Sequence, residues 1–186
     1  KQTKNGYKLL KMKRDGLFYE FRSLLSDMIE AKRDLTATYR LAKQRIDLAN
    51  AIEGGLAVRA AAIASTGHPE VEVERRNIMG VVVPSVSGTN LKSTFEERGV
   101  GYIGSSTYID EAGDSFGTLI EKIVKASEME ATLKRLLEEI EATKRRVNAL
   151  EFKVIPELED ARVFIQLRLE EMEREETFRL KRFKNK

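Results

Sequence analysis

Apolar residues recur every seven positions through the first third of the chain. No proline interrupts the stretch from Tyr7 to Ser65, and a seven-residue apolar repeat is typical of a helix that lays one face against another helix. The stretch ends on Thr66-Gly67-His68-Pro69, where glycine and then proline stop a helix. The pattern predicts an N-terminal coiled-coil helix over residues 1–65. Its repeated apolar positions are Phe21, Met28, Leu35, Ala42, Ala49, Leu56 and Ile63.

The last third of the chain shows the same repeat, which predicts a C-terminal coiled-coil helix over residues 114–186. Both predicted helices are far longer than the usual helix of about 11 or 12 residues, so each needs a partner along its length. We expect the two to fold back on each other, with Phe21 facing Ala161, Ala42 facing Ile140, Ala49 facing Leu133 and Leu56 facing Ala126. The repeated positions of this second helix are Leu119, Ala126, Leu133, Ile140, Val147, Val154 and Ala161.

The middle of the chain, residues 66–113, has a different pattern. β-Branched residues gather between Val71 and Val83, and Pro84 ends the run. Glycine, serine and threonine are frequent from Ser85 to Gly101, which favours a mobile loop, and the segment from Gly99 to Ile109 is a possible second strand. The expected fold class is therefore mainly α: a long antiparallel two-helix coiled-coil hairpin with a small β-hairpin or irregular element in the middle of the chain.

The composition is typical of long helices with solvent-exposed polar faces. Charged residues make up 34% of the 186 residues and aromatic residues 7%, and cysteine is absent, which excludes disulfides and thiolate chemistry. No apolar run reaches the roughly 18–20 residues of a membrane span, and no signal peptide is visible, so we expect a cytosolic protein without membrane insertion. The net charge of +3 does not require a nucleic-acid partner. The chain starts at Lys1 without methionine, so we expect residues to have been lost upstream.

The usual signatures of catalysis are missing from the sequence. The glycines of Gly99–Ser106 lack the lysine of a phosphate-binding loop. His68 stands alone, and carboxylates such as Glu138 and Glu141 are typical of a solvated helix face. We expect no catalytic residue, no cofactor site, no metal site and no enzyme activity in this chain.

Three features of the predicted helices suggest more than a uniform rod. Gly54-Gly55 lies inside the first helix, where it favours close helix approach, a local bend or a docking surface. Pro156 lacks the N–H that would bond the carbonyl of Phe152, so it should bend the second helix. Arg145 and Arg146 lie eleven and ten residues before Pro156. They are candidates for contact with a partner, and the alternative is that they are simply solvated.

Both chain ends are basic, and in an antiparallel hairpin they meet at one tip. Lys181 and Arg182 near the C-terminus are candidates for contact with an acidic partner. Solvated chain ends are the alternative reading.

Several sequence blocks resemble the D subunit of the V-type and archaeal A-type ATPases. They are LLKMKRD at 9–15, NIMGVVVP at 77–84, RRVNALE at 145–151, IPELE at 155–159 and RLEEMEREE at 168–176. The resemblance extends over nearly the whole chain, although the family usually has more residues before the first block. It implies a non-catalytic central rotor shaft on the cytoplasmic side of the membrane, in a peripheral position within a membrane-bound complex.

The same resemblance implies the partners. The termini of the chain would stand inside a hexamer of alternating A and B subunits, where ATP is hydrolysed. The small F subunit would clasp the lower shaft, and a socket subunit (C or d) would join it to the membrane rotor ring. Pro156 would then set the tip off-axis, and Arg145 and Arg146 would offer charge to the enclosing hexamer. The sequence leaves open which ion is moved and whether ATP is mainly made or hydrolysed.

Two other functions fit a coiled-coil hairpin. A prefoldin-like chaperone also joins two long helices through a β element, but it needs apolar helix tips, and these tips are charged. A nucleic-acid-binding coiled-coil arm would use the basic tip, but acidic residues such as Glu173 and Glu175 lie beside it.

Overall fold

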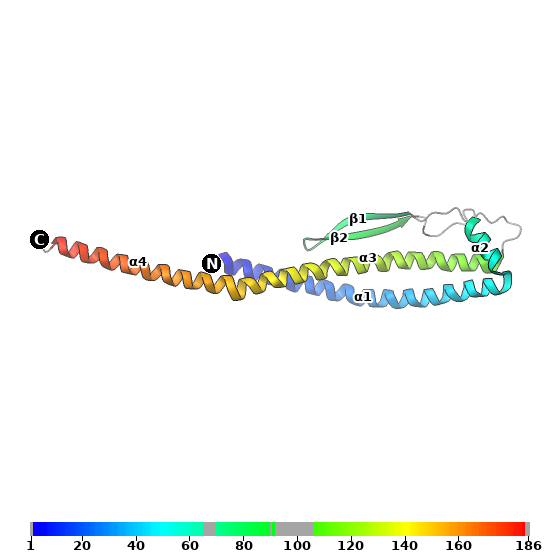
Figure 1. Cartoon of the computed structure of the whole chain (residues 1–186), viewed down its shortest axis with the longest axis horizontal. Coiled ribbons are helices and arrows are strands. Elements are labelled where there is room, and N and C mark those ends of the chain that lie inside the picture. The colour runs from blue at the N-terminus through cyan, green and yellow to red at the C-terminus, as the bar shows by residue number, and fades with distance from the viewer. Residues whose placement is uncertain (1, 65–69, 90, 92–105, 185–186) are drawn as a thin grey trace. The chain divides into compact units, whose positions relative to one another are not determined.

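The computed structural model describes residues 2–64, 70–89, 91 and 106–184. Along the chain the elements are α1 (Gln2–Glu53), α2 (Gly55–Ala64), β1 (Glu70–Ile78), β2 (Val81–Thr89), α3 (Thr107–Ala149), the π-helical segment η2 (Leu150–Val154) and α4 (Ile155–Lys184) (Figure 1). The predicted fold class, long helices with a small β-hairpin in the middle, is confirmed. The chain divides into two compact units, residues 17–139 and residues 1–16 with 140–186.

The predicted segment boundaries need two corrections. The helix expected over 1–65 is interrupted at Gly54, and the second long helix begins at Thr107 rather than at 114. Part of Gly99–Ile109, the possible second strand, is therefore the first turn of α3. The rest of that segment, like His68 and the predicted stop at Thr66-Gly67-His68-Pro69, lies outside the described residues.

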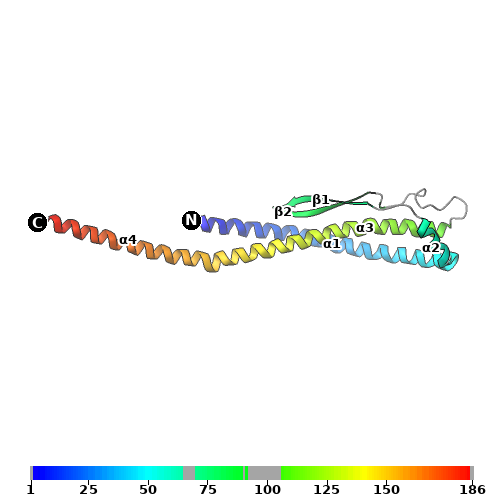
Figure 2. The same ribbon diagram turned by 45° about the horizontal axis from the view of Figure 1, so that its top comes forward.

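In the unit of residues 17–139, α1 and α3 run antiparallel and side by side, as both views show (Figures 1 and 2). Arg45 Nη1 donates a hydrogen bond to Ser115 Oγ at 2.7 Å, and Lys122 Nζ donates one to Thr38 Oγ1 at 2.8 Å. The expected pairing of Ala49 with Leu133, both in this unit, is therefore wrong, by about three heptads. A heptad repeat determines which face of a helix is buried, but not which heptads of two helices meet.

Burial supports an apolar seam in this unit. Leu17, Leu136, Ala42 and Ala49 are fully buried, and Leu119 and Leu133 nearly so. Four further predicted seam residues are half-buried: Phe21, Met28, Leu35 and Ala126.

Leu56 and Ile63 do not belong to this seam. Each is 85% exposed, because both lie in α2, beyond the point where α1 stops. The prediction that Leu56 and Ile63 are buried in a seam with the second helix of the same chain is therefore wrong.

Gly54 ends α1. Its φ is +85°, in the left-handed region that favours glycine, and its N–H donates to the carbonyl of Asn50 at 3.1 Å. Among the described residues, no atom outside Gly54 and its two chain neighbours lies within 4 Å of the position that a Cβ of Gly54 would occupy. The close helix approach expected here is thus not the role of Gly54, which acts as a helix stop.

The two adjacent glycines should respond oppositely to alanine. Gly54→Ala should destabilise the chain by about 1–2 kcal/mol, because alanine is strained at positive φ. Gly55→Ala should stabilise it by about 0.5–1 kcal/mol, because Gly55 is helical and its added Cβ would be in ordinary van der Waals contact with Asn50 Oδ1, at 3.9 Å. Thermal unfolding of both variants tests this, and equal shifts of the two would contradict it.

The β element is a hairpin within residues 70–89. Ile78 pairs with Val81, and the turn residues Met79 and Gly80 both have positive φ, as a two-residue type I′ turn requires. Asn77 Oδ1 accepts a hydrogen bond from the N–H of Gly80 at 2.8 Å. The single apolar run expected to end at Pro84 is in fact two strands, and Pro84 is tolerated because both strands of a two-stranded sheet are edges.

The other unit, residues 1–16 with 140–186, holds its buried residues on α3. Ile140 is 9% exposed, Val147 1% and Thr143 0%. Lys4 forms an ion pair with Glu159, which holds the pKa of that carboxyl below its ordinary value through a hydrogen bond and charge attraction. Of the predicted seam positions on this side, Val154 is half-buried, whereas Ala161 is exposed, which corrects its assignment.

Thr143 carries a buried hydroxyl oxygen that has no hydrogen-bond partner among the described residues. An unsatisfied buried polar group destabilises a fold by about 1–3 kcal/mol, so Thr143→Val should raise the free energy of unfolding by an amount of that order. Thr143→Ser keeps the hydroxyl, loses a methyl group and should lower it. Urea denaturation of the two variants measures both changes. A Thr143→Val variant no more stable than the parent would show that the hydroxyl is satisfied in solution.

Candidate functional site

Helix α4 exposes large apolar side chains along its whole length and has no buried residue. A soluble chain rarely leaves this much apolar surface without a partner. The exposed fractions run from 50% at Leu158 to 80% at Phe183. The members of this set, named here the α4 apolar surface, are Leu158, Val163, Phe164, Ile165, Leu167, Leu169, Met172, Phe178, Leu180 and Phe183.

Short-range contacts support α4 as a helix. Arg168 pairs with Glu171 at 3.0 Å and also lies over the ring of Phe164, 5.8 Å from its centroid. Arg179 pairs with Glu175 at 3.9 Å. Exposed pairs of this spacing contribute about 0.2–0.5 kcal/mol each. They favour the helical conformation of α4 and leave its apolar side chains free for contact.

The π-helical segment η2 lies immediately before Pro156. The N–H of Ile155 donates to the carbonyl of Leu150, five residues back. A π turn shifts the backbone pairing by one residue, and this is how the helix passes a proline that cannot donate to Phe152. The ribbon changes direction around this segment, where yellow gives way to orange in both views (Figures 1 and 2). Pro156 itself is exposed in the first turn of α4.

The arginine and lysine side chains that we predicted to contact a partner are all exposed on the surface. Arg145 forms a 3.7 Å pair with Glu141 and keeps 73% of its side chain exposed, and Arg146 is exposed as well. Lys181 and Arg182 are exposed in the last turn of α4, where basic residues suit the helix dipole. Each of the four is accessible to a partner.

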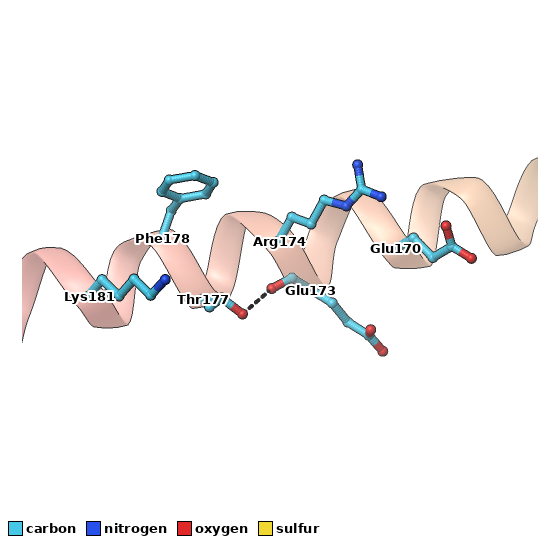
Figure 3. A pocket seen from close by; sticks show the side chains of 6 residues that line it. All are labelled: Glu170, Glu173, Arg174, Thr177, Phe178 and Lys181. Carbon is cyan, nitrogen blue, oxygen red and sulfur yellow. Dashed lines mark hydrogen bonds between the residues drawn. The ribbon is translucent and has the colours of Figure 1, made fainter.

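A shallow hollow on α4 is a gap between neighbouring side chains of one helix. Figure 3 shows the side chains that line it, with Phe178 and Arg174 rising from the helix and the Thr177 hydroxyl donating to the carbonyl of Glu173 at 2.8 Å. No second element of the described chain closes it, so the hollow is part of a contact surface rather than a ligand pocket.

Neither a metal cluster nor a membrane-spanning helix is found in the described part of the chain. Among residues 2–64, 70–89, 91 and 106–184, no group of three or more His, Cys, Asp or Glu side chains is placed to hold a metal ion. Within the same ranges, no helix combines the length and apolar character needed to cross a membrane.

Sequence reasoning missed the α4 apolar surface. The signal was present, because Val163, Phe164 and Ile165 are consecutive and so cannot all lie on one buried stripe. Consecutive bulky apolar residues on a charged helix indicate a surface that is covered on several sides.

Fold and surface together define a class: a helical-hairpin protein with an exposed apolar helix, suited to work as one component of a larger assembly. The family model for the D subunit of ATP synthase matches residues 1–185. The chain belongs to the ATP synthase D-subunit family.

Curated relatives support the same assignment. The chain is 53% identical to the A-type ATP synthase D subunit of Methanococcoides burtonii, over 99% of this chain and 89% of the relative. It is 52% identical to that of Methanosarcina mazei, over 99% and 88%, and 48% identical to that of Haloquadratum walsbyi, over 99% and 79%. The predicted family is confirmed, and neither the chaperone nor the nucleic-acid-binding alternative is favoured.

Proposed function

We propose that this chain is the central-stalk rotor component of a rotary A-type ATP synthase. It transmits torque between an ATP-hydrolysing hexamer of A and B subunits and the membrane rotor ring, and it has no active site of its own. Membership of the D-subunit family supports a place in an ATP synthase complex. The α4 apolar surface is the observation that supports the role of a shaft enclosed by other subunits. A helix of 30 residues with no buried side chain is about 45 Å of surface that requires an enclosing partner.

The proposed partners follow the expected arrangement of the stalk. α4 and the chain ends lie inside the hexamer, the F subunit clasps the lower part of the shaft, and a socket subunit (C or d) joins it to the membrane ring. The chain thus works in a peripheral position on the cytoplasmic side of the membrane. Arg145, Arg146, Pro156, Lys181 and Arg182 are the proposed contact residues toward the hexamer.

The test is reconstitution from purified subunits of one organism. The chain alone should hydrolyse no ATP, the A and B subunits should hydrolyse it, and the chain should co-purify with them and with the F subunit. A bead attached to this chain in a surface-fixed hexamer should then rotate during hydrolysis. Stable binding to the hexamer without rotation, or no binding at all, would overturn the rotor assignment.

Charge reversal at the C-terminal tip should weaken assembly. The double variant Lys181→Glu and Arg182→Glu turns two exposed cations into anions, so its affinity for the hexamer should fall most at low salt, where charges are least screened. Lys125→Glu with Lys134→Glu makes the same charge change on exposed positions of α3 and should leave hexamer binding nearly unchanged. A binding constant that neither the tip variant nor salt alters would exclude these two contacts.

A further inference from the structure

Two cationic side chains reach across the helix pair in the unit of residues 17–139. Arg45 on α1 donates to Ser115 Oγ at 2.7 Å and to the carbonyl of Glu111 at 3.4 Å. Lys122 on α3 donates to Thr38 Oγ1 at 2.8 Å. Ser115 is 5% exposed, so its hydroxyl belongs to the helix interface rather than to the solvated face.

The two contacts repeat at the heptad spacing on both helices. Thr38 and Arg45 are one heptad apart on α1, and Ser115 and Lys122 are one heptad apart on α3. Each helix thus offers one cation and one hydroxyl, and each cation meets the hydroxyl of the other helix. We name these contacts the two polar rungs, Arg45–Ser115 and Lys122–Thr38.

The apolar seam beside the rungs discriminates poorly between registers. Ala42 lies between Thr38 and Arg45 and is fully buried, as is Ala49 one heptad on. A small alanine excludes few partners sterically, and an apolar heptad repeat presents much the same face after a slide of seven residues.

The rungs do distinguish the registers. A slide of one heptad in one direction would bring Arg45 to the position of Lys122, so two cations would meet at the interface. The opposite slide would bring Arg45 to Tyr108 and Lys122 to Ala31, and both cations would lose their short hydroxyl partners. In the observed register, Asp34 Oδ2 lies 3.7 Å from Lys122 Nζ. After the second slide, the carboxylate of Asp27 would take the place of the Asp34 carboxylate beside Lys122.

We propose that the two polar rungs set the register of α1 against α3, so that the helices do not slide past each other by a heptad. A buried polar residue at a coiled-coil position commonly specifies register in this way. The inference concerns the hairpin itself and does not depend on the rotor assignment. In a shaft under load, it would be the device that keeps twisting force from being lost in slippage.

The chain has no cysteine, so register can be measured with two introduced spin labels. Gln44→Cys on α1 and Lys134→Cys on α3 are exposed positions within the same unit. They are far enough apart along the helix axis that a slide of one heptad changes their separation by about 10 Å. The slide that brings Arg45 to Lys122 shortens the separation, and the opposite slide lengthens it. Pulsed dipolar spectroscopy of the full-length chain reads the distance directly.

Two variants test the rungs. Lys122→Glu removes one rung and creates an attraction to Arg45 in the slid register, so a population about 10 Å shorter should appear. Arg45→Leu with Lys122→Leu removes both rungs and should give more than one distance from a protein that stays helical. Lys125→Glu, an exposed neighbour with the same charge change, should keep the single parental distance. A single unchanged distance in both rung variants would overturn the proposal, and the leucine variant decides it alone should Lys122→Glu fail to fold.

Discussion

Truncation of Leu136 to alanine should lower the free energy of unfolding of the unit of residues 17–139 by about 2–5 kcal/mol. Leu136 is 0% exposed and lies among the buried residues of α3. Its removal both forfeits buried apolar surface and leaves a cavity, and a closely packed interior relaxes only partly around such a void. Domains of this size are commonly stable by only 5–15 kcal/mol, so the loss would be a large part of the total.

Leu137→Ala is the matched control for this variant. Leu137 is the next residue on the same helix and has the same side chain, but it is 45% exposed. Its truncation should change stability by less than about 1 kcal/mol. Urea denaturation followed by helical circular dichroism compares the two. Equal losses would mean that the seam does not run through Leu136, and the antiparallel arrangement derived from the polar contacts would need revision.

The heptad pattern predicted the elements well because it reports directly on burial. Ala42, Ala49, Leu119 and Leu133 are buried where the repeat placed them, since a seven-residue apolar period keeps one face of a helix against a partner. The pairing of the heptads was not predictable from the same signal. It depends on polar contacts such as Arg45–Ser115, and these become visible only when both helices are in place.

Local backbone chemistry explains two other differences. The sequence suggested close helix approach, a local bend or a docking surface at Gly54-Gly55, and the helix stop became evident only from the positive φ of Gly54. The hairpin turn was missed because its first residue is Met79, and methionine rarely takes a left-handed conformation. An asparagine before Gly80 would have been the usual signal for such a turn.

The candidate contact surface was only partly predictable, for a physical reason. The heptad repeat through Ala161 predicted a seam, and the same repeat on the N-terminal helix made that helix the expected partner of the seam. Because α4 has no buried residue, its covering surface must come from elsewhere. A periodic apolar pattern reports that a face is buried in the working assembly, and not which molecule buries it.

Replacement of Pro156 by alanine should straighten the helix and remove the π turn. Alanine restores the N–H that can bond the carbonyl of Phe152 in the α-helical pattern, so the longer bond from Ile155 to Leu150 is no longer favoured. A proline inside a helix destabilises it by about 3 kcal/mol. The existing π turn relieves part of that strain, so the expected gain in stability is positive and below this value.

Spin labels at Lys144 and Glu176, both exposed and both in the unit that contains residues 140–186, measure the straightening. An undistorted helix would separate these backbone positions by about 48 Å. The parental chain should give a shorter distance, and Pro156→Ala should lengthen it toward that value. Glu157→Ala, an exposed neighbour, should leave the distance unchanged.

The same variant tests whether the bend matters for torque. If the bend around η2 places the tip of the shaft off-axis, a straightened shaft should meet the catalytic interfaces of the hexamer more equally. The reconstituted complex with Pro156→Ala should then bind the hexamer but hydrolyse ATP with poorer coupling to rotation. A straightened helix, shown by the spin labels, together with unchanged rotation and coupling would separate the two claims: the proline would shape α4 without serving the rotor. An unchanged distance would instead show that the helix bends around Leu150–Val154 for a reason other than Pro156, which follows that segment.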